Sequence, residues 1–594
     1  MKSEKTIKEE VSIVLAGAAG QGIQSIEKIL SHIIKEDGYH VFTTSEFMSR
    51  VRGGMNSTEI RVSSRNAHAY VNNIDILIPL KPGLTPFLEQ RISEDTIIIG
   101  EKEELDYEQI IDVPFSAIAK EIGNKLYSNT VALGLIGGLL KLNEELMEEH
   151  IAKVFSSKGD EVVENNRRAL QEGYRRGKEL GKSYSIEISK SGEAPEKTAA
   201  KPMLLSGTDA VALGALAGGC NMISSYPMSP STGVLVSLAG YAERMGIVAE
   251  QAESEIAAIN MALGGWYAGG RAMITTSGGG YDLMTEGVSL AAMIESPLVL
   301  HIAQRPGPAT GLPTRTGQED LNLVLYAGHG EFPRVILAPG TPTEAFELTK
   351  QAFDIADRYQ VPVFILTDQY LLDSFFDTPR FQIDATQPAN HFVKTDADYR
   401  RYRLADTDNE SDSHTEPDPH TDHDGLSPRG IPGYGEGRVR IDSDEHTEDG
   451  YITEDVIGIR PAMVKKRLYK RHQLLQKAAL PPELIGSASY STLVVCWGSN
   501  RNVAVEALQK IGSDDIALLH LTQLYPLHPS VAEYLDRAAR TCLVENNATG
   551  QCADLLRHET GRKIDEKILK YNGIPFSVEE LQEKIEKIAG VHNE

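Results

Sequence analysis

The sequence predicts a multidomain α/β protein, and three observations support this fold class. Short apolar runs, the pattern of buried strands, alternate with helical patterns along most of the chain. Glycine-rich or polar turns follow several of these runs, as expected where parallel strands lead into helices. The chain has 594 residues, too many for one hydrophobic core. We therefore expect about three or four domains of ordinary size.

The charge balance and the cysteines argue against several classes of protein. Lys plus Arg number 59 and Asp plus Glu number 84, so the formal net charge of −25 argues against a nucleic-acid partner. The four cysteines are scattered without a Cys-x-x-Cys pair, so we expect no iron–sulfur cluster and no metal on this chain. No apolar run has the length of a signal peptide or a spanning helix. We predict a cytoplasmic protein that does not enter a membrane.

The N-terminal region has the pattern of a small α/β domain. An apolar strand at residues 11–16 runs into the turn Gly17-Ala-Ala-Gly20-Gln-Gly22, and a helical pattern follows at residues 23–34. This order favours an anion at a helix N-terminus. The spacing differs from the dinucleotide-binding fingerprint, however, so a tight turn or a partner contact remains an alternative.

A second turn in this region carries two arginines beside flexible backbone. Arg50 and Arg52 lie between strands that we expect at residues 39–44 and 58–62. The turn fits an anion-binding or docking loop, and a plain solvated hairpin is the alternative. Further strands are expected at residues 75–79 and 96–100.

The stretch at residues 247–270 orders a strand, an acidic turn and a helix. The apolar run at residues 247–249 is followed by Glu250, Glu253 and Glu255, and then by an Ala/Gly-rich helical pattern. Ligands of α/β sheets bind at the carboxyl ends of strands, so these carboxylates are placed to meet one. Small side chains in the helix would let a flat ring or a partner subunit approach closely. The alternative is that the acidic side chains only complement the first helical turn.

Polar or glycine-rich loops follow the other strands of this region. Strands are expected at residues 271–276, 297–303, 335–338 and 361–367. The loop residues that we single out are Tyr226, Pro227 and Ser229, then Ser277 and Gly278, and finally Arg305, Thr310 and Arg315. Strand ends thus supply carboxylates, hydroxyls and arginines within one domain, which a scaffold does not require. A helix N-cap is the alternative explanation for the hydroxyls of the first loop.

The helix and strand periodicity weakens between residues 378 and 480. Residues 406–424 are an acidic low-complexity segment that includes His414, His420 and His423. A metal site there would need a rigid first shell, so a solvated loop is the better interpretation. A stiff turn is expected at residues 427–433 and a basic helix at residues 463–476.

The C-terminal region has the pattern of a last α/β domain. Strands are expected at residues 492–496, 516–519 and 541–544, and the polar turn that begins with Glu545 follows the last of these. No nucleophile or base constellation is evident, so we interpret this region as an oligomerisation or docking domain.

Several motifs together resemble the α subunit of the 2-oxoacid:ferredoxin oxidoreductases, in the form with a γ domain fused in front. The motifs are residues 248–264, Tyr226-Pro-Met-Ser-Pro-Ser231, Arg305-Pro-Gly-Pro-Ala-Thr-Gly-Leu-Pro-Thr314 and Glu545-Asn-Asn-Ala-Thr-Gly-Gln551. Gly17-Ala-Ala-Gly-Gln-Gly22 and Val51-Arg-Gly-Gly54 are similar to that γ domain. The resemblance covers nearly the whole chain except the acidic segment.

The family resemblance implies a division of the chain into domains. We expect a γ-type α/β domain at residues 1–185, a linker at 186–203, a pyrimidine-binding-type α/β domain of thiamine-diphosphate enzymes at 204–377, an irregular acidic insert with a connecting helix at 378–487, and a transketolase-C-terminal-like α/β domain at 488–594.

The resemblance also implies a role for each candidate residue. Glu255 matches the catalytic carboxylate that hydrogen-bonds the pyrimidine ring nitrogen of thiamine diphosphate and so promotes proton removal from the cofactor. Ser229 and Arg305 fall where the family contacts the 2-oxoacid, and a guanidinium matches a carboxylate in two hydrogen bonds. The remaining assignments are Thr310 and Arg315 to the substrate, Tyr226, Pro227, Ser277 and Gly278 to the cofactor, and Gly20, Gly22 and Arg52 to coenzyme A.

The resemblance implies that this chain forms half of an active site. Thiamine diphosphate with Mg²⁺ would be shared with a β subunit that holds the diphosphate, the metal and a [4Fe-4S] cluster. This sequence agrees with that division, since it has neither a Gly-Asp-Gly motif for Mg²⁺ and diphosphate nor a cysteine set for a cluster. Coenzyme A and ferredoxin are the other expected partners, in an (αβ)2 assembly. Residues 311–315 look like those of 2-oxoglutarate-type members. The alternatives are a pyruvate, branched-chain or arylpyruvate enzyme, or a non-catalytic scaffold or regulatory chain of the same fold.

Overall fold

The computed structural model describes residues 5–18, 22–47, 54–105, 107, 109–190, 203–383, 388–404 and 425–591. The chain forms two compact units. The first contains residues 1–206, 373–380 and 576–583, and the second contains residues 207–372, 381–575 and 584–594. Within the described part of the chain, none of the helices combines the length and apolar character needed to cross a membrane.

The first unit is built on an eight-stranded mixed sheet with the order β7-β6-β5-β2-β4-β3-β16-β9. Its strands are β2 (Glu10–Ala18), β3 (His40–Glu46), β4 (Met55–Ser63), β5 (Ile76–Pro79), β6 (Ile97–Gly100), β7 (Ile110–Asp112), β9 (Met203–Ser206) and β16 (Phe375–Thr378). The central strand β2 pairs with β4 along its whole length and buries its interior residues. The separate strands β1 (Lys5–Lys8) and β8 (Tyr184–Glu187) pair in parallel.

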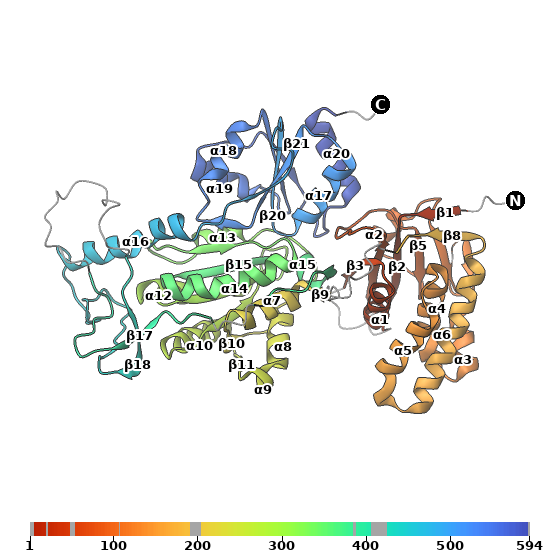
Figure 1. Cartoon of the computed structure of the whole chain (residues 1–594), viewed down its shortest axis with the longest axis horizontal. Helices are drawn as coiled ribbons and strands as arrows, with labels where there is room; N and C mark the ends of the chain where they lie inside the picture. The colour runs from red at the N-terminus through yellow and green to blue at the C-terminus, as the bar shows by residue number, and fades with distance from the viewer. Residues whose placement is uncertain are drawn as a thin grey trace. The chain divides into compact units, whose positions relative to one another are not determined.

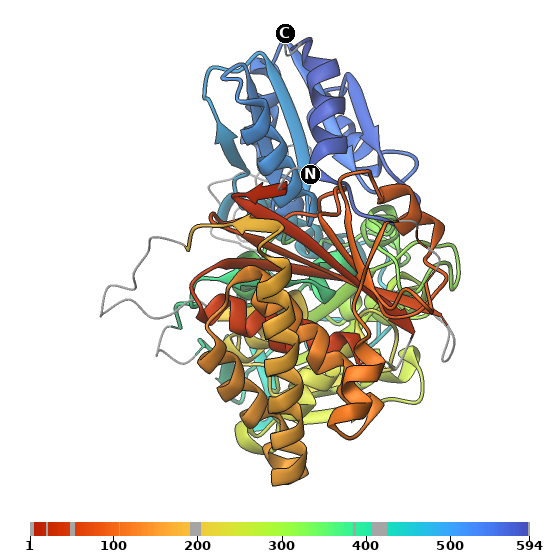
Figure 2. The ribbon, with the colours of Figure 1, turned by 90° about the vertical axis from the view of Figure 1, so that its right-hand side faces the viewer.

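Six helices accompany this sheet: α1 (Ile23–Glu36), α2 (Pro86–Arg91), α3 (Phe115–Ile122), α4 (Ser128–Leu140), α5 (Glu144–Phe155) and α6 (Asp160–Leu180). Figure 2 shows the orange helices of this unit below its red strands. Helices α4 and α6 approach at the level of their backbones, because a Cβ on Gly134 would lie 2.2 Å from the carbonyl oxygen of Leu170. Glycine therefore permits the contact.

The second unit contains a seven-stranded sheet with the order β11-β10-β12-β13-β15-β14-β22. Its strands are β10 (Met222–Ser225), β11 (Val248–Gln251), β12 (Ala272–Thr276), β13 (Leu298–Gln304), β14 (Val335–Leu337), β15 (Pro362–Asp368) and the antiparallel β22 (Gln523–Tyr525). The first six strands are parallel, so their carboxyl ends lie at one edge. Strands β12, β13 and β15 are fully buried, as in parallel sheets covered on both faces.

The helices that connect these strands follow them closely in sequence. They are α7 (Gly207–Ala217), α8 (Thr232–Gly240), α9 (Ala242–Met245), α10 (Glu255–Tyr267), α11 (Gly278–Asp282), α12 (Thr285–Met293), α13 (Leu321–Tyr326), α14 (Pro342–Tyr359) and α15 (Gln369–Asp373). Helix α14 begins at the N-cap Thr341, whose hydroxyl accepts the Glu344 N–H, and the Glu344 carboxylate accepts the Gly340 N–H.

The second unit also contains a five-stranded sheet with the order β19-β21-β20-β23-β24. Its elements are β19 (Glu483–Gly486), β20 (Thr492–Trp497), α17 (Asn500–Ile511), β21 (Ile516–Leu521), α18 (Ser530–Arg537), β23 (Arg540–Glu545), α19 (Gln551–Thr560) and β24 (Glu566–Leu569), and the last helix of the chain is α20 (Val578–Ala589). Figure 1 shows α18 and α19 on one side of these blue strands and α17 on the other. Four of the strands are parallel.

A connecting region of the second unit joins its two larger sheets in sequence. It contains the paired strands β17 (Phe392–Thr395) and β18 (Arg429–Gly435) and the long helix α16 (Ile459–Lys477). Two lysines of α16 bind one buried carboxylate, because Lys466 Nζ and Lys470 Nζ lie 2.7 and 2.5 Å from the Glu295 oxygens. The buried ion pairs fix α16 against the chain that follows α12.

The structure confirms the strands expected in all three α/β regions and the basic helix, with ends that differ by a few residues. It corrects three local interpretations. Residues 278–282 form the short helix α11 rather than a loop, Glu250 belongs to β11 rather than to a turn, and residues 429–435 form β18 rather than a stiff turn. Pairing with β10 and β17 explains the two strands, since neighbouring strands outweigh local turn preference.

Candidate active site

Four neighbouring strands bring the predicted site residues to one edge of the seven-stranded sheet. Strands β11, β10, β12 and β13 lie side by side and run in the same direction. The segments that follow them carry Glu255, Ser229, Ser277 and Arg305, respectively. The topology therefore gathers these side chains as predicted for a ligand site of an α/β sheet.

Glu255 is a buried carboxylate at the start of a helix. It is the first residue of α10, whose N-cap Ser254 accepts the Ala257 N–H at 3.2 Å. The Glu255 side chain is only 4% exposed, and its Oε1 has no hydrogen-bond partner among the described residues. A buried polar atom without a partner is costly, so this oxygen is available to a ligand group that donates a hydrogen bond.

The glycines of α11 make room for two carboxylates. A Cβ on Gly280 would lie 2.2 Å from Thr276 Oγ1 and 2.9 Å from Glu255 Oε1, and a Cβ on Gly278 would lie 2.2 Å from Asp320 Oδ1. Side chains at either position would displace these polar groups. A Cβ on Gly279 would instead meet only the Ala309 carbonyl, at an ordinary 3.6 Å.

Further unpartnered oxygens surround this short helix. Among the described residues, Thr276 Oγ1, Ser277 Oγ and Asp320 Oδ2 are buried without a hydrogen-bond partner. Together with Glu255 Oε1 they form a set of polar atoms from β12, α10 and the chain before α13. Such a set fits a ligand that carries several hydrogen-bonding groups.

Arg305 and Ser229 are brought into direct contact. Arg305 Nη1 donates a hydrogen bond to the Ser229 backbone carbonyl at 2.8 Å, which joins the loops after β13 and β10. Arg305 is half-buried, and burial lowers the pKa of its guanidinium, an effect that the nearby Asp320 opposes. The Ser229 side chain is exposed.

Asp320 is a candidate functional residue that the sequence analysis missed. Burial raises the pKa of the Asp320 carboxyl to about 7, with a further contribution from Glu319, whereas Arg305 acts in the opposite direction. The Gln304 side chain accepts the Asp320 N–H at 3.1 Å and so fixes the backbone here. Near neutral pH this side chain can exchange a proton, a property that recurs at active sites. In the sequence, Asp320 resembles an ordinary acidic residue before a helix.

The other predicted residues belong to the loops of this edge or to the first unit. Tyr226 is 41% exposed, Pro227 and Arg315 are half-buried, and Thr310 is exposed. Gly22 lies in the first unit, before α1, with a left-handed φ of 77° that glycine favours. Gly20 and Arg52 lie outside the described residues, as do Arg50, residues 191–202 and the acidic segment 405–424.

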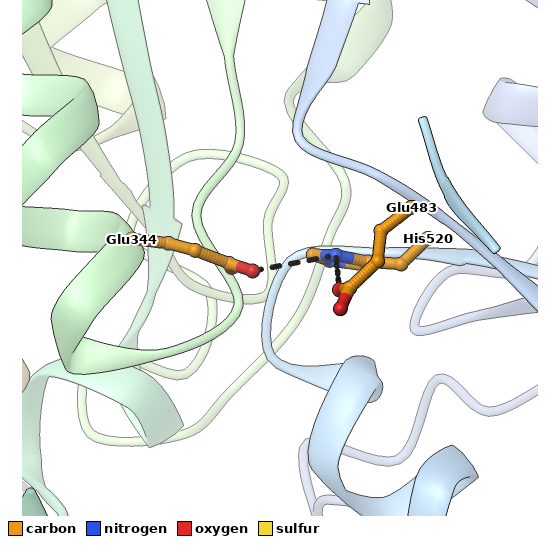
Figure 3. A group of neighbouring side chains, drawn as sticks. All are labelled: Glu344, Glu483 and His520. Atoms are coloured by element: carbon orange, nitrogen blue, oxygen red, sulfur yellow. Dashed lines mark ion pairs between the residues drawn. The ribbon is translucent and has the colours of Figure 1, made fainter. Parts of the chain in front are cut away.

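A second group of side chains has the residue types of a metal site. An arginine that contacts its carboxylates accounts for this arrangement instead. Glu344, Glu483 and His520 turn their polar atoms toward one another (Figure 3). The Glu483 and His520 residues are direct partners across β19 and β21, and His520 Nδ1 lies 3.6 Å from Glu344 Oε1. Arg501 reaches both carboxylates, at 3.4 Å from Glu344 and 2.9 Å from Glu483.

The charge of Arg501 gives this group a structural role. Burial lowers the pKa of His520 to about 3, so the imidazole is neutral and the guanidinium is the cation that both carboxylates face. The resulting ion pairs attach α17 to the start of α14. A metal ion in this position would have to displace Arg501, so we regard the group as an ion-pair network.

Comparisons with known proteins identify the family models and relatives that this chain matches. Residues 213–466 match the family model described as pyruvate flavodoxin/ferredoxin oxidoreductase, thiamine diP-bdg, and residues 12–176 match the model pyruvate ferredoxin/flavodoxin oxidoreductase. The matches define the class of protein as a thiamine-diphosphate-type oxidoreductase chain. The first model includes β11, α10, α11 and the loop that carries Arg305.

Relatives extend the similarity over the whole chain. The 2-oxoacid:ferredoxin oxidoreductase subunit alpha of Sulfolobus sp is 28% identical over 97% of both chains, and the 2-oxoglutarate oxidoreductase subunit KorA of Mycobacterium tuberculosis is 28% identical over 89% of this chain and 76% of its own. A solved 2-oxoglutarate:ferredoxin oxidoreductase from Magnetococcus marinus is 27% identical, with a TM-score of 0.86 over 98% of this chain and 99% of that one. The chain belongs to the 2-oxoacid:ferredoxin oxidoreductase family and corresponds to its alpha subunit.

Proposed function

We propose that this chain is the α subunit of an enzyme that oxidatively decarboxylates 2-oxoglutarate to an acyl-CoA and passes the electrons to ferredoxin. The observation that carries this proposal is the buried, unpartnered Oε1 of Glu255 beside Gly280 in the thiamine-type domain. The Magnetococcus marinus relative, whose structure was solved with 2-oxoglutarate, coenzyme A and succinyl-CoA bound, supports the choice of reaction.

The residues at the sheet edge fit the aminopyrimidine half of thiamine diphosphate. When bound, this cofactor supplies the electron sink for decarboxylation. Glu255 Oε1 would accept a hydrogen bond from the ring and hold the shared proton, while Ser277 and Thr276 offer hydroxyls that lack partners among the described residues. Gly278 has no side chain to displace Asp320, and Gly278, Tyr226 and Pro227 would border the ring. The apolar helix α10 behind Glu255 would exclude water from this contact.

The adjacent loops fit the carboxylates of a 2-oxoacid. Arg305 would bind the 1-carboxylate through its planar guanidinium, and Ser229 would donate its hydroxyl to the same end of the substrate. Arg315 and Thr310, on the same loop, would bind the distal carboxylate that distinguishes 2-oxoglutarate from pyruvate. Asp320 in its protonated form would donate a hydrogen bond beside Arg305 without neutralising it.

The proposal includes a second subunit. The diphosphate, Mg²⁺ and the [4Fe-4S] cluster would be held by a β subunit in an (αβ)2 complex in the cytoplasm, because this chain's four cysteines are buried free thiols without the sequence spacing of a cluster-binding motif. Coenzyme A would contact the first unit near Gly20, Gly22 and Arg52. Ferredoxin would accept the electrons from the β subunit.

The proposal is tested by reconstitution with that β subunit. The complex is supplied with thiamine diphosphate, Mg²⁺ and coenzyme A, and ferredoxin reduction is followed with 2-oxoglutarate, pyruvate, a branched-chain 2-oxoacid and an arylpyruvate. We expect the highest kcat/KM with 2-oxoglutarate. A preference for another 2-oxoacid would correct the substrate, and the absence of turnover with all four would favour a scaffold or regulatory chain.

Arg315→Leu tests the substrate assignment within this complex. Loss of the cation should raise KM for 2-oxoglutarate by about tenfold and leave KM for pyruvate nearly unchanged, since only the first substrate has a distal carboxylate. Arg358→Leu, on the exposed side of α14, is the matched control. An equal rise for both substrates would remove Arg315 from the specificity pocket.

A further inference from the structure

The loop that carries the substrate residues has little regular structure of its own. Residues 305–320 connect β13 to α13 without forming a helix or strand. Backbone groups in such a segment need partners elsewhere, and catalytic positioning needs them to be fixed. The contacts of this loop therefore decide how precisely Arg305 and Arg315 are held.

Gln318 is the point at which this loop is attached to the five-stranded sheet. Its backbone N–H donates to the Asn546 carbonyl at 2.7 Å, and its backbone carbonyl accepts the Asn547 Nδ2–H at 2.8 Å. Its side-chain Nε2 donates to the Trp497 carbonyl at 3.0 Å, while Oε1 accepts from Asn500 Nδ2 at 2.8 Å and from the Asn546 N–H at 3.0 Å. Gln318 is only 1% exposed, so these bonds form away from water.

Additional bonds attach the loop on both sides of Gln318. Thr316 N–H donates to the Gly573 carbonyl at 3.2 Å. Gln551 Nε2 donates to the Glu319 carbonyl at 2.8 Å, and Gln551 Oε1 accepts the Asn322 N–H at 2.8 Å.

These partners all come from one edge of the five-stranded sheet. Trp497 ends β20, Asn546 and Asn547 follow β23, and Gly573 follows β24. The carboxyl ends of parallel strands are where such sheets usually bind ligands. Here the same edge binds a loop of its own chain. This gives a role to the polar turn after Glu545, which the sequence analysis could not assign.

The orientation of the Asn547 side chain is fixed by its other contacts. Its Oδ1 accepts the N–H groups of Thr549 and Gly550 at 3.2 and 2.7 Å, so its Nδ2 must face the Gln318 carbonyl. The Glu545 carboxylate stabilises the start of this turn, since it accepts Trp497 Nε1–H and Cys552 N–H at 3.0 Å each. An aspartate at position 547 would bring an oxygen against the Gln318 carbonyl.

We propose that Gln318 and Asn547 are positioning residues, through which the five-stranded sheet holds the loop of Arg305 and Arg315 in the geometry that binds the 2-oxoacid. The inference rests on the proposed function. Neither side chain would touch the substrate or the cofactor. Both act through the backbone of residues 305–320, so their loss should weaken substrate binding before it affects the rest of the reaction.

Asn547→Asp in the full-length chain provides the test, with Gln509→Glu on the exposed face of α17 as a control for the same amide-to-carboxylate change. We expect amide hydrogen exchange in peptides of residues 305–320 to rise about tenfold, the loss expected from one buried hydrogen bond, while peptides of β13 keep their protection. In the reconstituted complex, KM for 2-oxoglutarate should rise about tenfold with little change in kcat or in KM for coenzyme A.

The two readouts separate this inference from the proposed function. Unchanged exchange in the loop of Asn547→Asp would overturn the positioning role even if the complex is active. A faster-exchanging loop with an unchanged KM would also overturn it. If wild-type complex turns over no 2-oxoacid, the proposed function fails, and the exchange result alone then decides whether the sheet holds the loop.

A milder variant covers the case in which Asn547→Asp does not fold. Gln551→Ala removes the bonds to Glu319 and Asn322 but keeps Gln318 attached. We expect about a threefold rise in loop exchange and in KM for 2-oxoglutarate. Values equal to those of Gln509→Glu would contradict the proposal.

Discussion

The carboxyl edges of the two large sheets in the second unit use polar side chains in opposite ways. At the seven-stranded sheet, buried oxygens of Glu255, Thr276 and Asp320 have no partner among the described residues. At the five-stranded sheet, the polar side-chain atoms of Asn547 and Glu545 form hydrogen bonds with other residues of the chain. Both edges have the topology of a ligand site.

The difference shows that strand topology alone does not identify a binding site. What distinguishes the two edges is whether the buried polar atoms are satisfied. We therefore expect the edge with unsatisfied atoms to receive a ligand, whereas the edge with satisfied atoms holds a loop. Variants at the seven-stranded edge should therefore impair catalysis directly, whereas variants at the five-stranded edge should change stability or loop order and affect KM only through the loop.

The largest effect in this comparison is expected from Gly280→Ala. The added methyl group would collide with Thr276 Oγ1 and Glu255 Oε1, and a displacement of about 1 Å at a reacting group can cost about 100-fold in rate. We expect that loss in kcat of the reconstituted complex. Gly279→Ala, whose Cβ meets only an ordinary contact, should retain at least half of the activity. Equal losses in both variants would contradict the assignment.

Asp320→Asn should remove a pH dependence from the ligand edge. The Asp320 carboxyl, with its pKa raised to about 7 by burial and by Glu319 and Asp282 and lowered by Arg305, ionises as pH rises above neutral. The new charge would oppose the substrate carboxylate at Arg305, so KM for the 2-oxoacid should rise about fivefold between pH 6 and 8, equivalent to about 1 kcal/mol. The variant should show a flat profile, and Asp514→Asn, at an exposed position in the turn before β21, should keep the slope. A wild-type KM that does not change with pH would contradict this role.

At the five-stranded edge, Glu545→Gln should change the free energy of unfolding and not the pH dependence of KM. Burial raises the pKa of Glu545 to about 7 in the folded chain, against opposing hydrogen bonds from Cys552 and Trp497 and the charge of Lys567. Because the folded pKa lies above the unfolded one, this group stabilises the fold fully below about pH 4.5 and loses that contribution as pH rises through 7.

Glu545→Gln cannot ionise, so it does not lose stability as the pH rises through 7. The difference in unfolding free energy between variant and wild type should therefore shift in favour of the variant by about 3 kcal/mol between pH 4.5 and 8, measured by thermal unfolding of the full chain. The pH slope of KM should stay as in the wild type. A changed KM slope with unchanged stability would reverse the distinction between the two edges.

Much of the fold and part of the site followed from the sequence. Apolar runs predicted the strands because parallel strands buried on both faces leave a strong pattern. Glu255 and Arg305 could be singled out because each comes shortly after an apolar run, at the carboxyl ends of β11 and β13. Asp320 and Gln318 were not, because the loop that contains them has no periodicity and their partners are distant in the chain. The sequence shows that residue 280 is a glycine, but only the structure shows that a side chain there would collide with the Glu255 carboxylate.

Strand β16 illustrates a second limit of the sequence. Its four residues pair with β3 and β9 in the sheet of the first unit, although more than 160 residues separate it from β9. Asp377 in this strand accepts hydrogen bonds from Lys35 and His40 at 2.6 Å. A local sequence pattern does not indicate which distant strand a short strand will pair with. The unit to which β16 belongs could therefore not be predicted.

The most direct test of the account is Glu255→Gln in the reconstituted complex. The amide keeps the size of the side chain but cannot hold the proton shared with the pyrimidine ring, so turnover of the 2-oxoacid at saturating thiamine diphosphate should fall by about 100-fold or more. Glu253→Gln, two residues earlier and exposed, should retain wild-type turnover. Full activity in Glu255→Gln, or an equal loss in Glu253→Gln, would contradict the claim that the unpartnered carboxylate of Glu255 is the catalytic contact with the cofactor.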